Sequence, residues 1–476
     1  MRKLFLFITV WVFSLSLFSQ TEPYDISRLY TNKLSNGMTL IYYRIPDVSY
    51  SSLYLGFNAG SRYDEIRFEG ESKLLEKLAF KGTAKIGSKN IAEELRFMNE
   101  LEKIDEEILT LREKGESNNK EKEINELIKK ALLLRSKVDE QIIPRAFENV
   151  LYSYGAKYYY ARSTPDFFEI GITFPKDFLE EIISLEGDFF VEPVFRNFYD
   201  ERYNLFQEAS SIQNASNSEN YKRIMKSAFG EKSSDGIPSS IQKISLKQFK
   251  DYFKKALNPK YGVIVISGNY EWEKVFAVAE KYFGKITSDS KEPLMIPDVK
   301  FAKSSYTVFS DEGISIAFKK ENISSQSEAA IDLIANYLTG GEKPLLQTRI
   351  SDKIKSGNFL NGDPGLMPPS LLIITLKLKE GSDAESEAKK TTEFFLNFNK
   401  MNIDSKSFEQ ARKRLLFSIY LNSERSGNIV RQIGEGFLLS KESSYFFDYV
   451  KSVKTLSLET IKNISSKIFI NEKEEK

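Results

Sequence analysis

The chain has 476 residues, a length that suggests two or three domains rather than one core. Its 68 basic and 67 acidic residues leave a net charge of +1, so the whole molecule has no field that would attract nucleic acid. Cysteine and histidine are both absent. These absences exclude disulfides, cysteine nucleophiles, histidine general bases and every metal site built from those two residue types.

The first twenty residues have the pattern of an export signal. Arg2 and Lys3 precede an almost entirely apolar run over residues 4–18, and polar residues follow from Ser19. This run is shorter than the roughly 20 residues that a membrane-spanning helix needs. We therefore expect residues 1–20 to be a secretory signal peptide rather than an anchor. The mature protein is expected to cross the inner membrane and to be periplasmic or extracellular, with no membrane span.

The mature chain opens with signals for a β-hairpin. Two short alternating segments flank Asn36-Gly37, a dipeptide that favours a tight hairpin turn. A third strand and an amphipathic helix are expected next, and Gly82 marks the end of that helix. The expected ranges are 29–34 and 38–43 for the hairpin, 51–57 for the third strand and 70–80 for the helix.

Residues 90–143 have a different pattern of apolar and charged residues. Leu101, Ile104 and Ile108 have the three-four spacing of a helix, and the same spacing resumes after an interruption near Gly115. Charged residues fill the other positions. This pattern predicts a solvated helical hairpin inserted into the first domain.

The remaining elements indicate two similar α+β units in tandem, each with an antiparallel sheet packed against helices. The first unit is expected at residues 24–287, a proline-containing linker at 288–298 and the second unit at 299–476. In the first unit we expect strands at 167–174 and 261–267, with helices at 176–190, 197–211, 246–257 and 271–283. In the second unit we expect strands at 314–319 and 371–378, helices at 326–338, 343–355, 384–399 and 405–422, and a glycine- and proline-rich loop at 357–369.

One segment carries a recognisable motif. Residues 70–83 read Gly-Glu-Ser-Lys-Leu-Leu-Glu-Lys-Leu-Ala-Phe-Lys-Gly-Thr. This segment resembles the inverted zinc-binding helix of the insulinase, pitrilysin and mitochondrial processing peptidase family, which reads His-x-x-Glu-His and is followed closely by Ala-Phe-Lys-Gly-Thr. The stretches 34–38, 59–65, 195–202 and 257–259 also look like parts of that family's first half. The resemblance is good over residues 29–290, and in the second half it extends only to the general order of strands and helices.

The resemblance implies a degenerate zinc site. Lys73 and Lys77 stand where the family has its two histidine ligands, Glu76 where it has the general base, and Glu208 where it has the third ligand. A lysine ammonium has no lone pair to donate, so we expect no zinc cofactor. Two possibilities stay open. Either the two ammonium groups replace the charge of the metal and keep both glutamates ionised, or these side chains point to solvent.

Other positions implied by the resemblance have also changed. The family's substrate-binding edge strand corresponds here to Tyr160, Ala161, Arg162 and Ser163. Strand addition uses only main-chain groups, so this edge is still able to bind peptide. In the second half, Leu345 and Phe359, with Arg349 nearby, stand nearest the family's substrate-carboxylate contacts. The chain also stops soon after Ile470, before a last strand that is typical of the family.

The sequence therefore predicts a secreted, catalytically inactive homologue of these metallopeptidases. By resemblance, it is a non-catalytic subunit that binds unfolded peptide and pairs with an active paralogue whose His-x-x-Glu-His motif is intact. Two alternatives remain. The chain acts alone as an extracytoplasmic peptide-binding protein, or it is a working metallopeptidase whose metal site is built from Asp and Glu alone.

Overall fold

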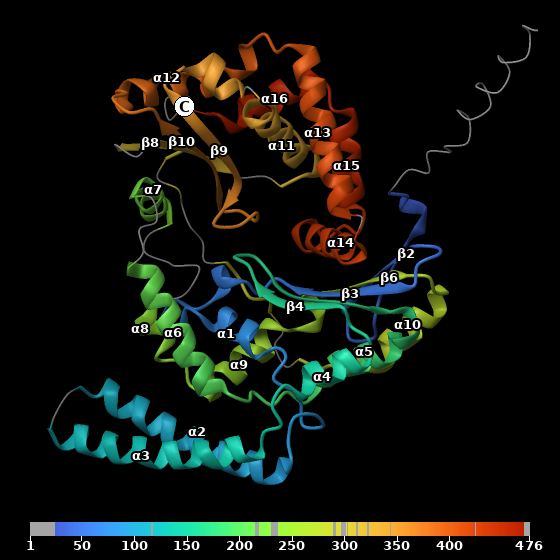
Figure 1. The fold of residues 1–476 in the computed structure, drawn as a ribbon, viewed down its shortest axis with the longest axis vertical. Coiled ribbons are helices and arrows are strands. Elements are labelled where there is room, and N and C mark those ends of the chain that lie inside the picture. The colour runs from blue at the N-terminus through green and yellow to red at the C-terminus, as the bar shows by residue number, and fades with distance from the viewer. Residues whose placement is uncertain are drawn as a thin grey trace, which may run out of the picture.

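The computed structural model describes residues 24–115, 118–214, 219–229, 237–288, 292–296, 301, 303–310, 313–320, 323–342, 344–423 and 425–470. The expected signal peptide, residues 1–20, lies outside the described residues, and the expected linker at 288–298 lies only partly within them. The chain forms two units, each consisting of one sheet and its helices, and one unit lies above the other in the view of Figure 1. The expected α+β architecture of two tandem units is confirmed.

The first sheet has six strands in the order β1-β2-β6-β3-β5-β4. The β1–β2 hairpin is antiparallel, as Asn36-Gly37 predicts, and Gly37 has the positive φ of +89° that such a turn requires. β2 pairs in parallel with β6, and the other neighbours are antiparallel. β4 therefore lies at one edge. The strands are β1 (Leu29–Lys33), β2 (Thr39–Arg44), β3 (Tyr50–Phe57), β4 (Tyr158–Ser163), β5 (Phe168–Pro175) and β6 (Gly262–Gly268).

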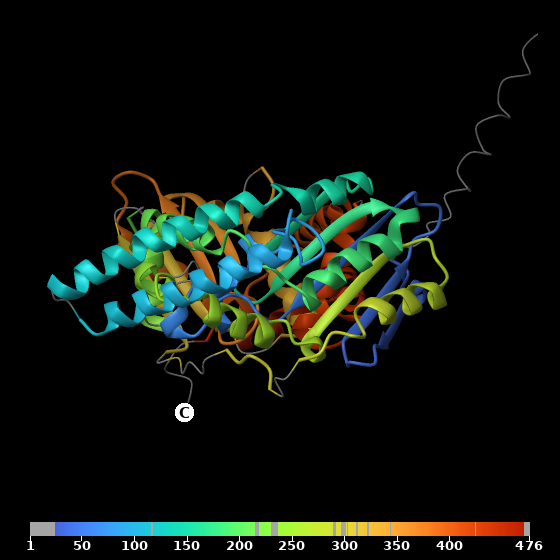
Figure 2. The same cartoon turned by 90° about the horizontal axis from the view of Figure 1, so that it is seen from below.

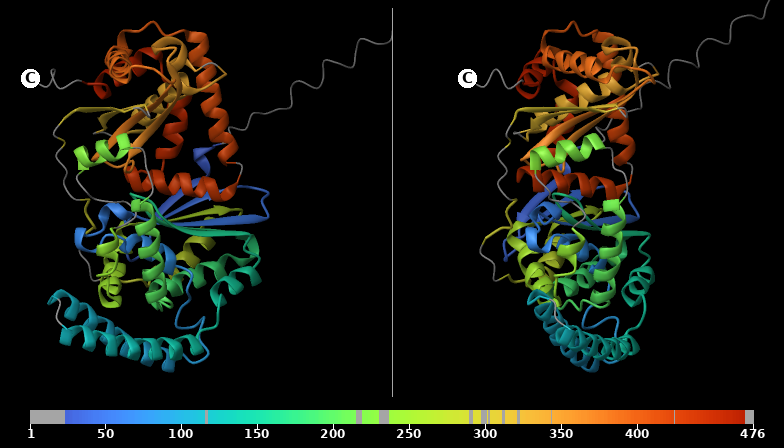
Figure 3. Two further views of the ribbon diagram at one scale, coloured as in Figure 1. Left: turned by 60° about the vertical axis from the view of Figure 1, so that its left-hand side comes forward. Right: turned by 90° about the vertical axis from the view of Figure 1, so that its left-hand side faces the viewer.

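Helices cover both faces of this sheet. Helices of the first unit lie on the lower face in Figure 1, and α14 of the second unit lies across the upper face (Figures 1 and 3). Burial on both sides explains why Val263–Ile266 is an uninterrupted apolar run. The lower helices and their neighbours are α1 (Glu71–Leu78), α4 (Ala146–Ser153), α5 (Leu179–Val191), α6 (Phe198–Asn214), α8 (Pro238–Ile241), α9 (Leu246–Ala256) and α10 (Trp272–Tyr282).

The insertion is a helical hairpin of α2 (Ile91–Glu113) and α3 (Asn118–Gln141). It projects beyond one end of the first unit (Figure 2). Its base is anchored by Arg196, a 1% exposed residue whose guanidinium pairs with the buried Glu94 carboxylate at 2.7 Å. The expected inserted hairpin is confirmed.

The second unit has a smaller antiparallel sheet, in the order β7-β8-β10-β9. One helix of the first half, α7 (Glu219–Phe229), packs against β7 and β8. The strands are β7 (Ser305–Ser310), β8 (Gly313–Lys320), β9 (Ile354–Asp363) and β10 (Ser370–Leu378). The helices are α11 (Ser325–Thr339), α12 (Ala384–Leu396), α13 (Ser405–Ser423), α14 (Ser426–Ser440), α15 (Tyr445–Thr455) and α16 (Leu458–Ile468).

Two expectations for the second unit are wrong. The expected helix at 343–355 is only a short π-helical turn over Leu346–Ile350, and the first part of the expected loop at 357–369 is the end of β9, so that only 364–369 connects β9 to β10. β9 pairs along most of its length with β10, so its backbone groups are satisfied by the ladder despite its glycines. Tertiary pairing therefore outweighs the local turn signals of this segment.

Candidate functional site

The motif helix α1 presents a polar face beside the edge of the first sheet. Leu74, Leu75 and Leu78 are buried in the core, which leaves Lys73, Glu76 and Lys77 on the other face. The helix begins after Gly70, whose φ of +113° favours glycine. The Asp64 carboxylate accepts hydrogen bonds from the first free amides of the helix, that of Gly70 at 2.9 Å and that of Ser72 at 3.2 Å. The start of α1 is thus held in place.

The first contact of this polar face runs to α6. The Lys77 ammonium donates to Glu208 Oε1 at 2.8 Å and so links the two helices. Two turns nearer the start of α6, Glu201 pairs at 2.7 Å with Lys81, which lies just beyond the end of α1. The side chains of Lys77 and Glu208 are 22% and 55% exposed, so their ion pair is partly solvated. Lysine–glutamate pairs therefore join α6 both to α1 and to the segment that directly follows α1.

The second contact runs to the backbone of β4. Glu76 Oε2 accepts a hydrogen bond from the Ser163 amide at 2.7 Å. The Lys73 ammonium donates to the Ser163 carbonyl at 2.8 Å and lies 3.3 Å from Glu76 Oε2. Lys73 and Glu76 therefore occupy both main-chain polar groups of the last residue of the edge strand.

All four residues that the motif singled out lie together, but they do not fit zinc. Zinc needs ligand atoms with free lone pairs, and the two lysine positions carry ammonium groups already engaged as donors. Among the described residues, no group of three or more Asp and Glu side chains is placed to hold a metal ion. Neither lysine points freely into solvent, because Lys73 is held by Ser163 and Lys77 by Glu208.

A cavity opens beside this cluster. Its volume is about 600 Å³, and it is lined in part by Glu76 and Lys77 of α1, by Asn197 and by Asp200 and Glu201 of α6. Residues of the segment that follows the hairpin complete it, including Arg145 and Glu148. Charges of both signs face this space.

The predicted substrate edge, Tyr160, Ala161, Arg162 and Ser163, lies on β4 at the open edge of the sheet. Arg162 is turned toward the second unit, where its guanidinium contacts Glu435 of α14 at 3.2 Å and also pairs with the buried Glu169. Burial and, after it, the nearby Glu435 carboxylate raise the pKa of Glu169 to about 7, although Arg162 opposes the shift. The sequence did not point to Glu169 or Glu435, because nothing local marks either residue.

The predicted positions of the second half lie elsewhere. Arg349 donates to the Asn402 carbonyl at 3.2 Å, and the Phe359 ring packs against Phe395 with centroids 5.9 Å apart. Leu345 packs against the core of the second unit. Within the described residues, these contacts belong to the second unit and do not bring the three side chains to the motif helix.

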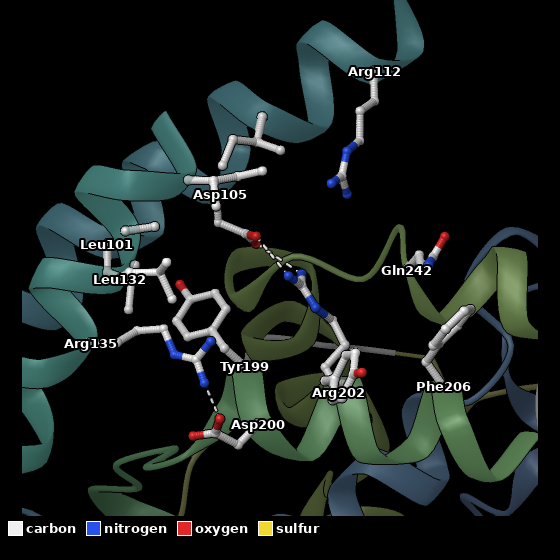
Figure 4. Close-up of a pocket in the computed structure, with 14 residues that line it drawn as sticks. Leu101, Asp105, Arg112, Leu132, Arg135, Tyr199, Asp200, Arg202, Phe206 and Gln242 are labelled. Carbon is white, nitrogen blue, oxygen red and sulfur yellow. Dashed lines mark hydrogen bonds and ion pairs between the residues drawn. The ribbon is translucent and has the colours of Figure 1, made fainter. Parts of the chain in front are cut away.

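A second cavity, also of about 600 Å³, lies between the inserted hairpin and α6 (Figure 4). Leu101 and Leu132 contribute to its apolar wall. Its charged side chains include Arg202, which pairs with Asp105 at 2.7 Å, and Arg135, which pairs with Asp200. Asp200 also lines the first cavity, so the two cavities share this residue. None of the described helices is long and apolar enough to cross a membrane.

Comparison with known families finds two matches. Residues 40–101, which include the motif helix, match the profile described as insulinase (peptidase family M16). Residues 243–415 match the profile described as the peptidase M16 inactive domain. Together they reach into both halves of the chain.

Curated relatives match over limited stretches. A 73-residue segment is 42% identical to an uncharacterized zinc protease of Rickettsia felis and covers 15% of this chain and 16% of that protein. A longer match of 243 residues is 18% identical to the zinc protease PqqE of Helicobacter pylori and covers 49% of this chain and 54% of that protein. The chain thus matches between about a sixth and about half of the length of these relatives.

Solved structures share the whole architecture. A protease from Helicobacter pylori has a TM-score of 0.70 and 15% identity, over 93% of this chain and 97% of that one. A peptidase M16 inactive domain from Pseudomonas fluorescens has a TM-score of 0.66 and 16% identity, over 92% and 94% of the two chains. At such identities these likenesses establish the fold alone.

Proposed function

The chain belongs to the insulinase and pitrilysin family of peptidases, and we propose that it is a non-catalytic member that binds extended peptide. The observation that carries this proposal is the state of the motif helix. Lys73 and Lys77 stand at the two ligand positions and are held as donors to Ser163 and Glu208. Glu76, at the position of the general base, accepts from the Ser163 amide instead of facing a metal-bound water.

Peptide binding is supported by the geometry of β4. This strand lies at the edge of the sheet, and an edge strand presents unpaired main-chain donors and acceptors along one side. An extended peptide adds to such an edge through backbone hydrogen bonds, which do not depend on the side chains of the strand. The aromatic and charged residues that replace the family's pattern at Tyr160 and Arg162 therefore do not prevent binding.

Assembly and location are further parts of the proposal. We place the mature protein outside the cytoplasm, in the periplasm or beyond, on the basis of the basic and apolar start of the sequence. We propose that it pairs with an active family paralogue that carries the intact motif, and that the pair encloses the peptide. A lone peptide-binding protein is the second candidate. Size-exclusion chromatography of the two chains together decides between them, because only a paired subunit co-elutes with the paralogue.

The experiment that tests the degenerate site restores the missing ligands. Changing Lys73→His and Lys77→His together supplies two imidazoles one helical turn apart, with Glu208 of α6 available as a third ligand. Zinc is expected to raise the melting temperature of this double variant and to leave the wild type unchanged, because only a formed site gains binding free energy. The matched control adds Glu208→Gln to the double variant and is expected to weaken the zinc effect.

One outcome would contradict the proposal, and another would contradict the assignment of the degenerate zinc site. Stoichiometric zinc in the purified wild type, together with peptide hydrolysis that a chelator abolishes, would show a working metallopeptidase. Failure of the double variant to take up zinc would show that α1 and α6 do not hold these side chains in ligand geometry.

A further inference from the structure

The two polar groups that the Ser163 backbone presents at the edge of the first sheet are both occupied from within the chain. The Glu76 carboxylate accepts from the amide, and the Lys73 ammonium donates to the carbonyl. We propose that Lys73 and Glu76 act as a clamp that closes one end of the edge strand and limits how far a bound peptide extends along β4. This inference rests on the proposed peptide-binding function, because the clamp would limit peptide binding at the same β4 edge.

The direction of the Ser163 groups identifies the open part of the strand. In an antiparallel ladder, the amide and carbonyl of one residue point to one side, and those of the next residue point to the other. Because the Ser163 groups reach α1 rather than β5, those of Ala161 and Tyr159 point in the same outward direction. An added peptide strand thus finds three outward-facing residues on β4, and the clamp occupies the last of them.

The chemistry of the two clamp residues suits this task. A lysine carries three donors and no acceptor on a long flexible stem, so Lys73 is able to bind a carbonyl and a carboxylate together. It does both here, at 2.8 Å to Ser163 O and 3.3 Å to Glu76 Oε2. The ammonium charge offsets that of Glu76 while the carboxylate holds the Ser163 amide. Lys73 and Glu76 are 25% and 31% exposed, so water reaches the clamp and a peptide is able to compete with it.

A consequence for peptide recognition follows. A peptide that pairs along Tyr159 and Ala161 must end, bend or leave the sheet before Ser163, unless the clamp opens. Opening it adds one more residue pair to the bound strand, with up to two further backbone hydrogen bonds. We expect that gain to tighten the affinity by about tenfold or more.

The test uses two readouts on the full chain. The first is hydrogen exchange at the Ser163 amide without peptide. Exchange is expected to be slow in the wild type and at least tenfold faster after Glu76→Ala, because the amide loses its acceptor. Equal exchange rates in the two proteins would overturn the clamp.

The second readout is the affinity for a fluorescein-labelled, ten-residue unstructured peptide, measured by fluorescence anisotropy. The double variant Lys73→Met with Glu76→Ala is expected to bind about tenfold more tightly than the wild type, and Lys73→Met alone to an intermediate degree. The matched control Lys85→Ala breaks an exposed lysine–carboxylate pair with Asp188 and is expected to change nothing.

The two readouts separate the possible failures. Faster exchange with an unchanged affinity would overturn the claim that the clamp limits the peptide. Faster exchange with no binding by either protein would overturn the proposed peptide-binding function itself, and with it the role of the clamp in recognition, while the contact with Ser163 would stand.

Discussion

A carboxylic acid buried without a partner makes the stability of the first unit depend on pH. Glu186 lies in α5 with 0% of its surface exposed, and among the described residues neither of its carboxyl oxygens has a hydrogen-bond partner. Loss of hydration on burial raises its pKa from 4.5 to about 8. The folded chain therefore keeps this group protonated at neutral pH, whereas the unfolded chain ionises it.

The sign and size of the effect follow from this difference. Between pH 4.5 and pH 8 the folded state binds more protons at Glu186 than the unfolded state, so the free energy of unfolding falls as the pH rises through this window. Each pH unit is worth about 1.4 kcal/mol, and the rise from pH 4.5 to pH 7 therefore costs about 3 kcal/mol. A Glu186→Gln variant has the same shape as the protonated acid but does not titrate.

We expect the variant and the wild type to be similarly stable near pH 4.5, and the variant to be more stable by about 3 kcal/mol at pH 7. Urea unfolding of both proteins at several pH values measures the difference. The exposed Glu273→Gln in α10 is the matched control and is expected to show no such trend. A difference between Glu186→Gln and wild type that stays constant from pH 4.5 to pH 7 would refute the reasoning, because only a perturbed titration gives a pH-dependent gap.

Two further predictions concern the anchoring of the insertion and the contact between the two units. Arg196→Met leaves the buried Glu94 carboxylate without its ion pair. We expect the free energy of unfolding, measured by thermal unfolding followed by circular dichroism, to fall by about 3–5 kcal/mol. A fall of less than about 1 kcal/mol would argue against this anchor. Gly434→Ala places a Cβ in steric clash with the Tyr54 ring, where α14 packs on the first sheet. We expect it to cost about 1–3 kcal/mol and to make cleavage between the units faster in limited proteolysis, and an unchanged digestion pattern would contradict this packing.

The sequence by itself determined the elements whose signals are local. The Asn36-Gly37 turn predicts the β1–β2 hairpin because a tight turn depends on its own two residues. The apolar spacing of residues 90–143 predicts the inserted helical hairpin, and that of Leu74, Leu75 and Leu78 predicts the buried face of α1. The expectation that Lys73 and Lys77 do not ligate zinc also needs no structure, because an ammonium group lacks the necessary lone pair in any fold.

Only the tertiary structure decided features that depend on partners far apart in the chain. Residues 354–363 form β9 because β10 completes their hydrogen bonds, although their glycines locally favour a loop. Glu169 has a raised pKa because folding buries it near Glu435, which is 266 positions further along the chain. The Lys73 and Glu76 side chains meet the backbone of Ser163 because the sheet brings β4 beside α1. Backbone hydrogen bonding and burial are set by neighbours in space, and a single sequence contains no local signal of which residues those neighbours are.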